Sequence, residues 1–201
     1  MYKYKIYNNS IDYSGNNTTL TRLSKILNIK ITNKIQNNII GIHAYKFGKL
    51  VIDKNIIFIL IIGGTDINID VYNFTKFIVI NKCLKQAKFI ICFNKYIYNK
   101  MLLLNIDINK LKIIKQSVPR LKIKIKNNLR NFLSINTKKI YLAIGNIRPV
   151  KDIYYLKDIF SIHDMTLVII GNLIKGEKIN YKNIIHIGPV NINYIYGYLK
   201  Q

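Results

Sequence analysis

A chain of 201 residues, half of them hydrophobic, can form one medium domain or two small ones and is too apolar for an intrinsically disordered protein. The net charge of +23 would fit nucleic-acid binding, but scattered lysines among many A/T-codon residues (Ile, Asn, Tyr) reflect a biased genome, so no specific nucleic acid is expected. The longest apolar run, Ile56–Ile62, is far below the roughly 20 residues needed to cross a bilayer, so we expect no transmembrane segment and a cytoplasmic protein.

The predicted elements follow the order of an α/β protein. Several β-branched apolar runs end directly at a glycine, as the strands of a buried parallel sheet do, and stretches with helical spacing separate them. In chain order the elements are helix Thr19–Leu27, strand Ile56–Ile62, helix Asn73–Gln86, strand Phe89–Phe93, helix Lys95–Leu104, strand Ile140–Ile144, helix Val150–Phe160, strands Leu167–Ile170 and Ile184–Ile187, and helix Asn191–Gln201. This alternation predicts a doubly wound α/β arrangement. Cys83 and Cys92 lie in apolar surroundings and are expected to be buried, reduced thiols.

The stretch between Val118 and Lys138 predicts a domain boundary. Pro119 opens it, and Leu121–Lys126 alternates like an exposed strand before an Asn-rich sequence. We therefore expect one Rossmann-like domain over 1–120, a linker over 121–138 and a second Rossmann-like domain over 139–201. The last range is short for such a domain and stops inside a predicted helix, so we expect the second domain to be incomplete.

The most informative stretch follows the strand that ends at Gly145. Pro149 suits a first helical turn, yet Arg148 and Lys151 lie at the same helix start, where the macrodipole is already positive. Each such cation should cost about 0.3–1 kcal/mol unless an anion binds there. Arg148 is the more informative of the two, because the chain has only four arginines and very many lysines. Since helix N-termini bind phosphate, the stretch predicts a site for a phosphorylated ligand, with a solvated loop as the alternative.

Three motifs together resemble those of one enzyme family in order and spacing: Gly41–Gly48, Gly63–Asn68 and Arg148–Asp152. They are similar to motifs of glycosyltransferase family 4, and most of all to its glycosyltransferase 1 domain-containing subgroup. Ser14–Arg22 resembles that subgroup's first glycine loop and helix. The resemblance extends over nearly the whole chain. It implies the GT-B fold, in which two Rossmann-like domains face each other across a cleft, and a retaining glycosyltransferase that uses a nucleotide-sugar donor.

The resemblance also implies roles for particular residues. Arg148 and Lys151 would hold the donor's diphosphate and neutralise the charge that builds on the leaving group. Gly145 would let the backbone approach the phosphates closely. Gly15 and Asn16 would offer backbone N–H donors at the opposite helix start, beside the transferred sugar.

Two departures from the family pattern qualify this resemblance. Asn146 follows the glycine where many members carry arginine, a placement that the subgroup shares. The family's glutamate-bearing segment, which contacts the donor sugar and ribose, has no counterpart, because the only glutamate, Glu177, lies in a loop-like context. The resemblance therefore implies a truncated second domain with weak or absent activity.

His43 and Asp66 are the candidates for catalysis. By the resemblance His43 lies near the cleft and would hydrogen-bond the sugar or the acceptor, while a satisfied histidine at a strand end is an equal alternative. Asp66 would bind an acceptor hydroxyl or cap its turn. With only nine acidic residues in the chain, we expect no metal site, and the nucleotide sugar would be a substrate rather than a cofactor.

Three functions stay open at this point. The first is a retaining glycosyltransferase, or a truncated remnant of one, that works on a nucleotide-sugar donor and an acceptor of unknown class. The second is a non-catalytic GT-B relative that keeps the cleft without chemistry. The third is a polyanion-binding protein driven by the net charge of +23.

Overall fold

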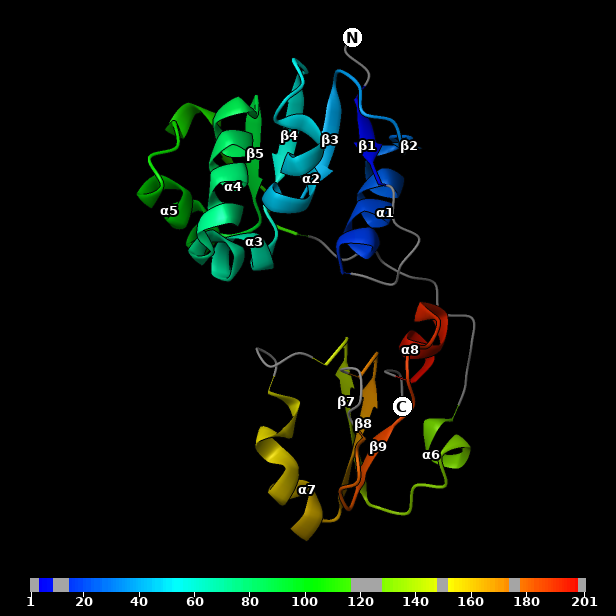
Figure 1. The fold of residues 1–201 in the computed structure, drawn as a ribbon. Helices are drawn as coiled ribbons and strands as arrows, with labels where there is room; N and C mark the ends of the chain where they lie inside the picture. The colour runs from blue at the N-terminus through cyan, green and yellow to red at the C-terminus, as the bar shows by residue number, and fades with distance from the viewer. Residues whose placement is uncertain (1–3, 9–14, 117–127, 148–151, 174–177, 199–201) are drawn as a thin grey trace. The chain divides into compact units, whose positions relative to one another are not determined.

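The computed structural model describes residues 4–8, 15–116, 128–147, 152–173 and 178–198. The chain divides into two compact units, an N-terminal unit over Met1–Pro119 and a C-terminal unit over Arg120–Gln201. Each has its own sheet and its own buried core (Figure 1). None of the helices in these described ranges is long and apolar enough to cross a membrane.

The N-terminal unit is built on a six-stranded sheet in the order β2-β1-β3-β4-β5-β6 (Figure 1). The strands are β1 (Lys5–Tyr7), β2 (Ile31–Thr32), β3 (Ile39–Ile42), β4 (Phe58–Ile61), β5 (Phe89–Cys92) and β6 (Leu111–Ile113). All neighbouring strands are parallel, so their carboxyl ends lie along one edge of the sheet. The order changes direction at β1, which makes the carboxyl ends of β1 and β3 the topological switch point, where such sheets usually bind ligands.

Helices cover both faces of this sheet because successive residues of a strand point to opposite faces. The helical elements are α1 (Gly15–Leu27), α2 (Ala44–Val51), α3 (Gly64–Asn68), η1 (Asp70–Tyr72), α4 (Phe74–Gln86), α5 (Lys95–Leu103) and η2 (Ile108–Lys110). On β3, Ile39 belongs to the core shared with α2, α4 and α5, whereas Ile40 and Ile42 pack with Leu20 of α1. Burial of each such side chain contributes about 1.5–3 kcal/mol, so the alternation along β3 fixes which helix covers which face.

Both cysteines lie in the core of the N-terminal unit. Cys83 on α4 and Cys92 at the end of β5 are fully buried and free. Burial raises the pKa of the Cys83 thiol to about 12 and that of Cys92 to about 11. The two side chains therefore behave as small apolar groups, as their apolar sequence surroundings predict.

The C-terminal unit is a smaller α/β layer structure with the parallel strand order β7-β8-β9. Its elements are α6 (Leu129–Phe132), β7 (Lys139–Ile144), η4 (Ile153–Leu156), α7 (Lys157–Ile162), β8 (Met165–Ile170), β9 (Ile184–His186) and α8 (Ile192–Tyr198). Leu129 of α6 and Tyr198 of α8 pack with Val168 on one face of the sheet. Phe160 of α7 packs with Ile169 on the other.

The structure confirms the α/β class and each of the five predicted strands, with small shifts at their ends. The predicted helix Val150–Phe160 is wrong in detail. Its described part is a 3₁₀ turn, η4, which begins at Ile153 and is followed by the short α7, and the N-cap residue Asp152 has a left-handed φ of 36°. Leu121–Lys126 lies outside the described residues. The rest of the expected linker contains α6, whose Leu129 belongs to the core of the C-terminal unit.

Candidate functional site

The switch point of the N-terminal sheet gathers several of the predicted site residues. His43 follows β3 directly, and its backbone N–H donates to the carbonyl of Ile61 in β4 (3.0 Å). Gly63 follows β4 and precedes α3. α2 begins at Ala44 and α3 at Gly64, so two helix N-termini lie at this edge.

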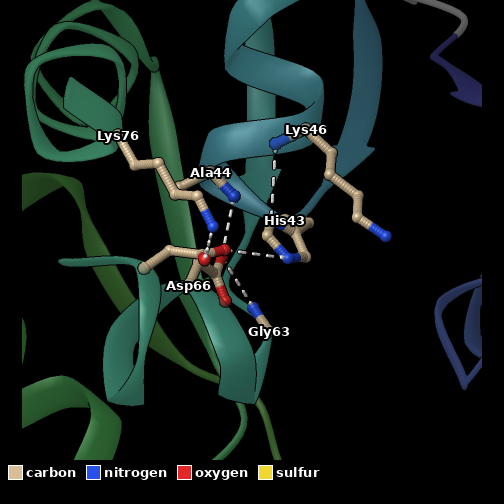
Figure 2. Close-up of polar contacts among 7 residues, drawn as sticks. His43, Ala44, Lys46, Gly63, Asp66 and Lys76 are labelled. Atoms are coloured by element: carbon tan, nitrogen blue, oxygen red, sulfur yellow. Dashed lines mark hydrogen bonds and ion pairs between the residues drawn. The ribbon is translucent and has the colours of Figure 1, made fainter. Parts of the chain in front are cut away.

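His43 is the N-cap residue of α2 and is held in an unusual backbone conformation. Its φ of 77° is rare for a residue other than glycine, and such conformations persist only where the surrounding structure fixes them. Nδ1 accepts a hydrogen bond from the Lys46 N–H (3.4 Å), which puts the ring proton on Nε2. Nε2 lies 3.6 Å from a carboxylate oxygen of Asp70. Both ring nitrogens therefore face groups of the protein (Figure 2).

Burial and the neighbouring charges keep His43 neutral. The side chain is only 3% exposed, and burial lowers its pKa to about 4, with Lys46 and Lys76 adding to the effect and Asp70 opposing it. A neutral imidazole can accept the N–H of Lys46, whereas an imidazolium could not. Loss of the charge is thus a condition of the cap that starts α2.

Asp66 lies in the first turn of α3 and ties that turn to α2. Its Oδ2 accepts the N–H of Ala44 (2.7 Å) and the N–H of Gly63 (3.2 Å), as Figure 2 shows. The carboxyl group is completely buried, and burial raises its pKa to about 7 although the two N–H donors oppose the shift. Its Oδ1 is buried without a hydrogen-bond partner among the described residues.

That unpartnered oxygen faces the bare Cα of Gly63. A Cβ at this position would lie 3.0 Å from Oδ1 of Asp66 and 3.9 Å from Oδ1 of Asn16 on α1. Asp66 and Asn16, which are 50 positions apart in the sequence, therefore converge on one glycine. Gly15, at the start of α1, is exposed and has open space around its Cα.

Two residues of this polar cluster, Asp70 and Lys76, are not among the site residues that the sequence predicts. Asp70 is 5% exposed and pairs with Lys76, whose Nζ lies 2.6 Å from its Oδ1. The same carboxylate faces His43, so it links the start of α4 to the end of β3. The spacing of Asp66 and Asp70, four residues apart, is the one sequence signal that places both on the same side of a helical stretch.

The corresponding edge of the C-terminal unit is lined by backbone. Gly145 follows β7 with a φ of 132°, and Gly171 follows β8 with a φ of 147°. A Cβ on Gly171 would lie closer than 3.0 Å to the Gly145 carbonyl, so the two loops touch through their main chains. Oδ1 of Asn146 accepts from both the N–H and the side-chain amide of Asn172 (3.1 and 3.2 Å), which clasps the loops together. His186 is also structural here, since its Nε2 lies 2.6 Å from the Gly171 carbonyl.

The predicted phosphate-binding cations, Arg148 and Lys151, lie outside the described residues. The described loop Gly145–Ile147 leads directly to them, and the N–H of Ile147 donates to the Asn172 carbonyl (2.8 Å). Among the predicted site residues, the structure thus brings His43, Asp66 and Asn16 together in the N-terminal unit and puts Gly145 at the sheet edge of the C-terminal unit.

This chain is similar to known proteins in its fold but not detectably in its sequence. No protein-family model and no curated protein matches the sequence. The crystal structure of Anabaena HepE in complex with UDP-glucose matches with a TM-score of 0.66 and 11% identity, over 94% of this chain and 70% of that one. HepE with UDP and glucose matches with a TM-score of 0.58 and 10% identity, over 97% and 72% of the two chains. HepE with UDP gives 0.56 and 11%, over 96% and 71%. The chain therefore has a GT-B-like fold, as the sequence predicts.

Proposed function

We propose that this protein is a retaining glycosyltransferase that takes its sugar from a nucleotide-sugar donor. The observation that carries the proposal is the fold likeness to HepE over nearly the whole chain, because the HepE structures contain UDP-glucose, UDP and glucose. The glycosyltransferase motifs of the sequence support it independently. They include Gly63–Asn68 at the switch point and Arg148–Asp152 after β7.

The donor would bind at the sheet edge of the C-terminal unit. Gly145, with its positive φ and no side chain, leaves room for a diphosphate next to the backbone. The clasp between Asn146 and Asn172 holds this loop in one arrangement. Arg148 and Lys151 follow Gly145 in the sequence by three and six residues and would neutralise the negative charge that develops on the leaving nucleoside diphosphate.

The acceptor would bind at the switch point of the N-terminal unit. Oδ1 of Asp66 is a buried oxygen beside Gly63 that has no hydrogen-bond partner among the described residues, and such a group gains most from a hydroxyl donor. Backbone N–H groups at Gly15 and Asn16 would contact the transferred sugar. His43 would act as a positioning residue, because its ring nitrogens already hold α2 and face Asp70.

Calorimetry with UDP-glucose and a panel of other nucleotide sugars tests the proposal. We expect the protein to bind at least one of them, and Arg148→Ala to weaken that binding about tenfold to a hundredfold, the usual effect of losing a charged hydrogen bond. Lys182→Ala is the matched control, since it removes the same charge at the amino end of β9, at the opposite edge of the sheet. Equal affinities for the two variants would refute the assignment of Arg148.

Turnover separates a working transferase from a non-catalytic relative. A radiolabelled nucleotide sugar that binds should be converted when an acceptor extract is present, and Asp66→Asn should reduce the rate. Binding without conversion would favour the non-catalytic GT-B relative. Tight RNA binding with a steep salt dependence, and no affinity for nucleotide sugars, would favour the polyanion-binding alternative.

A further inference from the structure

A short turn between α3 and α4 exposes a run of apolar side chains. Ile69 is 54% exposed, Tyr72 75% and Phe74 77%, all within six consecutive residues. Tyr96 of the neighbouring α5 adds a fourth at 58%. These four residues are called the aromatic patch below. Single exposed apolar residues are common, but a contiguous group of them marks an interaction surface.

Lys100 joins the parts of the aromatic patch. Its Nζ lies 4.9 Å from the ring centre of Tyr96 and 5.8 Å from that of Tyr72, and it donates to Oδ1 of Asn68 (3.0 Å). The hydroxyl of Tyr96 donates to the same amide oxygen (3.3 Å). The two tyrosines, one from η1 and one from α5, are thereby fixed around a single ammonium group, and α3 and α5 contact each other.

The stretch of chain that contains the aromatic patch carries a positive net charge. In the fully described stretch 64–103 the only acidic residues are Asp66 and Asp70, and both are buried. The same stretch carries six lysines: Lys76, Lys82, Lys85, Lys88, Lys95 and Lys100. Six lysines against two aspartates give this stretch a net charge of +4. Lys95 and Lys100 belong to α5, as Tyr96 of the patch does, and Lys76 at the start of α4 is paired with Asp70.

We propose that the aromatic patch docks the protein on an anionic lipid membrane, a property that goes beyond sugar transfer. Ile69 and Phe74 have no polar atom to offer a soluble ligand, whereas the headgroup boundary of a bilayer accepts them, and tyrosines prefer that boundary because one end is apolar and the other polar. Lys95 and Lys100, on the same helix as Tyr96, attract anionic lipids, and a lysine at a membrane surface contributes about fivefold in affinity. RNA fits less well, because Lys100 covers one face of each tyrosine ring that a base would need for stacking.

Sedimentation with vesicles tests the patch on the full chain. We expect the protein to pellet with vesicles of equimolar phosphatidylserine and phosphatidylcholine, to stay in solution with phosphatidylcholine alone, and to be released by high salt. The double variant Tyr72→Ser/Phe74→Ser should partition at least tenfold less, since it removes most of the apolar surface that would enter the bilayer.

A matched double variant elsewhere provides the control. Tyr155 and Ile162 of the C-terminal unit are 79% and 76% exposed, so Tyr155→Ser/Ile162→Ser removes a similar exposed surface and should leave partitioning unchanged. All four side chains are exposed, so circular dichroism should show that both variants fold. The proposal fails if wild type ignores both kinds of vesicle, if the two variants lose partitioning equally, or if the patch variant loses RNA binding instead.

Discussion

Replacing Gly171 by alanine is expected to destabilise the C-terminal unit by about 2–6 kcal/mol. Its φ of 147° is a conformation that side chains rarely adopt, which alone costs about 1–3 kcal/mol. In addition, the new Cβ would collide with the backbone of Gly145 and Asn146, so the loops after β7 and β8 must move apart, at a further cost of about 1–3 kcal/mol. Hydrogen-exchange mass spectrometry of peptides from β7 and β8 should show faster exchange, with β3 and β4 unaffected.

Gly188 offers the control for this substitution. It also has a positive φ, 71°, but open space surrounds its Cα, so Gly188→Ala carries only the conformational cost of about 1 kcal/mol. The same edge would hold the donor, so Gly171→Ala should weaken nucleotide-sugar binding and Gly188→Ala should not. Similar exchange rates for the two variants would contradict the close approach of the two loops.

The buried pair His43 and Asp66 should give the N-terminal unit two opposite dependences on pH. The folded pKa of His43 is lowered to about 4 from 6.5, so between those values the unfolded chain binds more protons and stability rises with pH. The folded pKa of Asp66 is raised to about 7 from 3.8, so between those values the folded chain binds more protons and stability falls with pH. Each slope reaches about 1.4 kcal/mol per pH unit, and in the wild type the two largely cancel.

Two single variants should each reveal one of these two dependences of stability on pH. His43→Asn keeps a residue that caps helices and accepts a positive φ, and it leaves Asp66 alone, so stability relative to wild type should fall as the pH rises from about 4 to 6.5. Asp66→Asn keeps a side-chain oxygen for Ala44 and leaves His43 alone, so relative stability should rise as the pH goes from about 4 to 7. Urea unfolding followed by circular dichroism across this range measures both slopes. Parallel profiles for the two variants would contradict the burial of these groups.

The strands that the sequence reveals are unbroken apolar runs. Leu167–Ile170 is such a run because helices cover both faces of β8, where these residues are all buried. Ile140–Ile144 is equally apolar although β7 is an edge strand, in which Tyr141 and Ile144 are each 45% exposed. β2, Ile31–Thr32, is a two-residue strand at the edge of its sheet, too short to leave a pattern. Its pairing with β1 is set by tertiary structure, which a local window of sequence does not contain.

The candidate site likewise contains residues that the sequence predicts and residues that it does not. Asp66 is visible in the sequence because a glycine pair and a threonine precede it, and His43 because it ends an apolar run. Asp70 and Lys76 look like ordinary surface residues in the sequence. Their pairing with each other and with His43 exists only because the start of α4 packs beside the end of β3.

The two thiols of the N-terminal unit have a practical consequence. Cys83 and Cys92 are the chain's only cysteines, and both sit in one half of it with pKa values far above neutrality. A maleimide can reach these buried thiols only when the N-terminal unit opens, so the rate of alkylation measures how often that unit opens. The C-terminal unit has no cysteine and does not react, so alkylation measures the opening of the N-terminal unit without any contribution from the other unit.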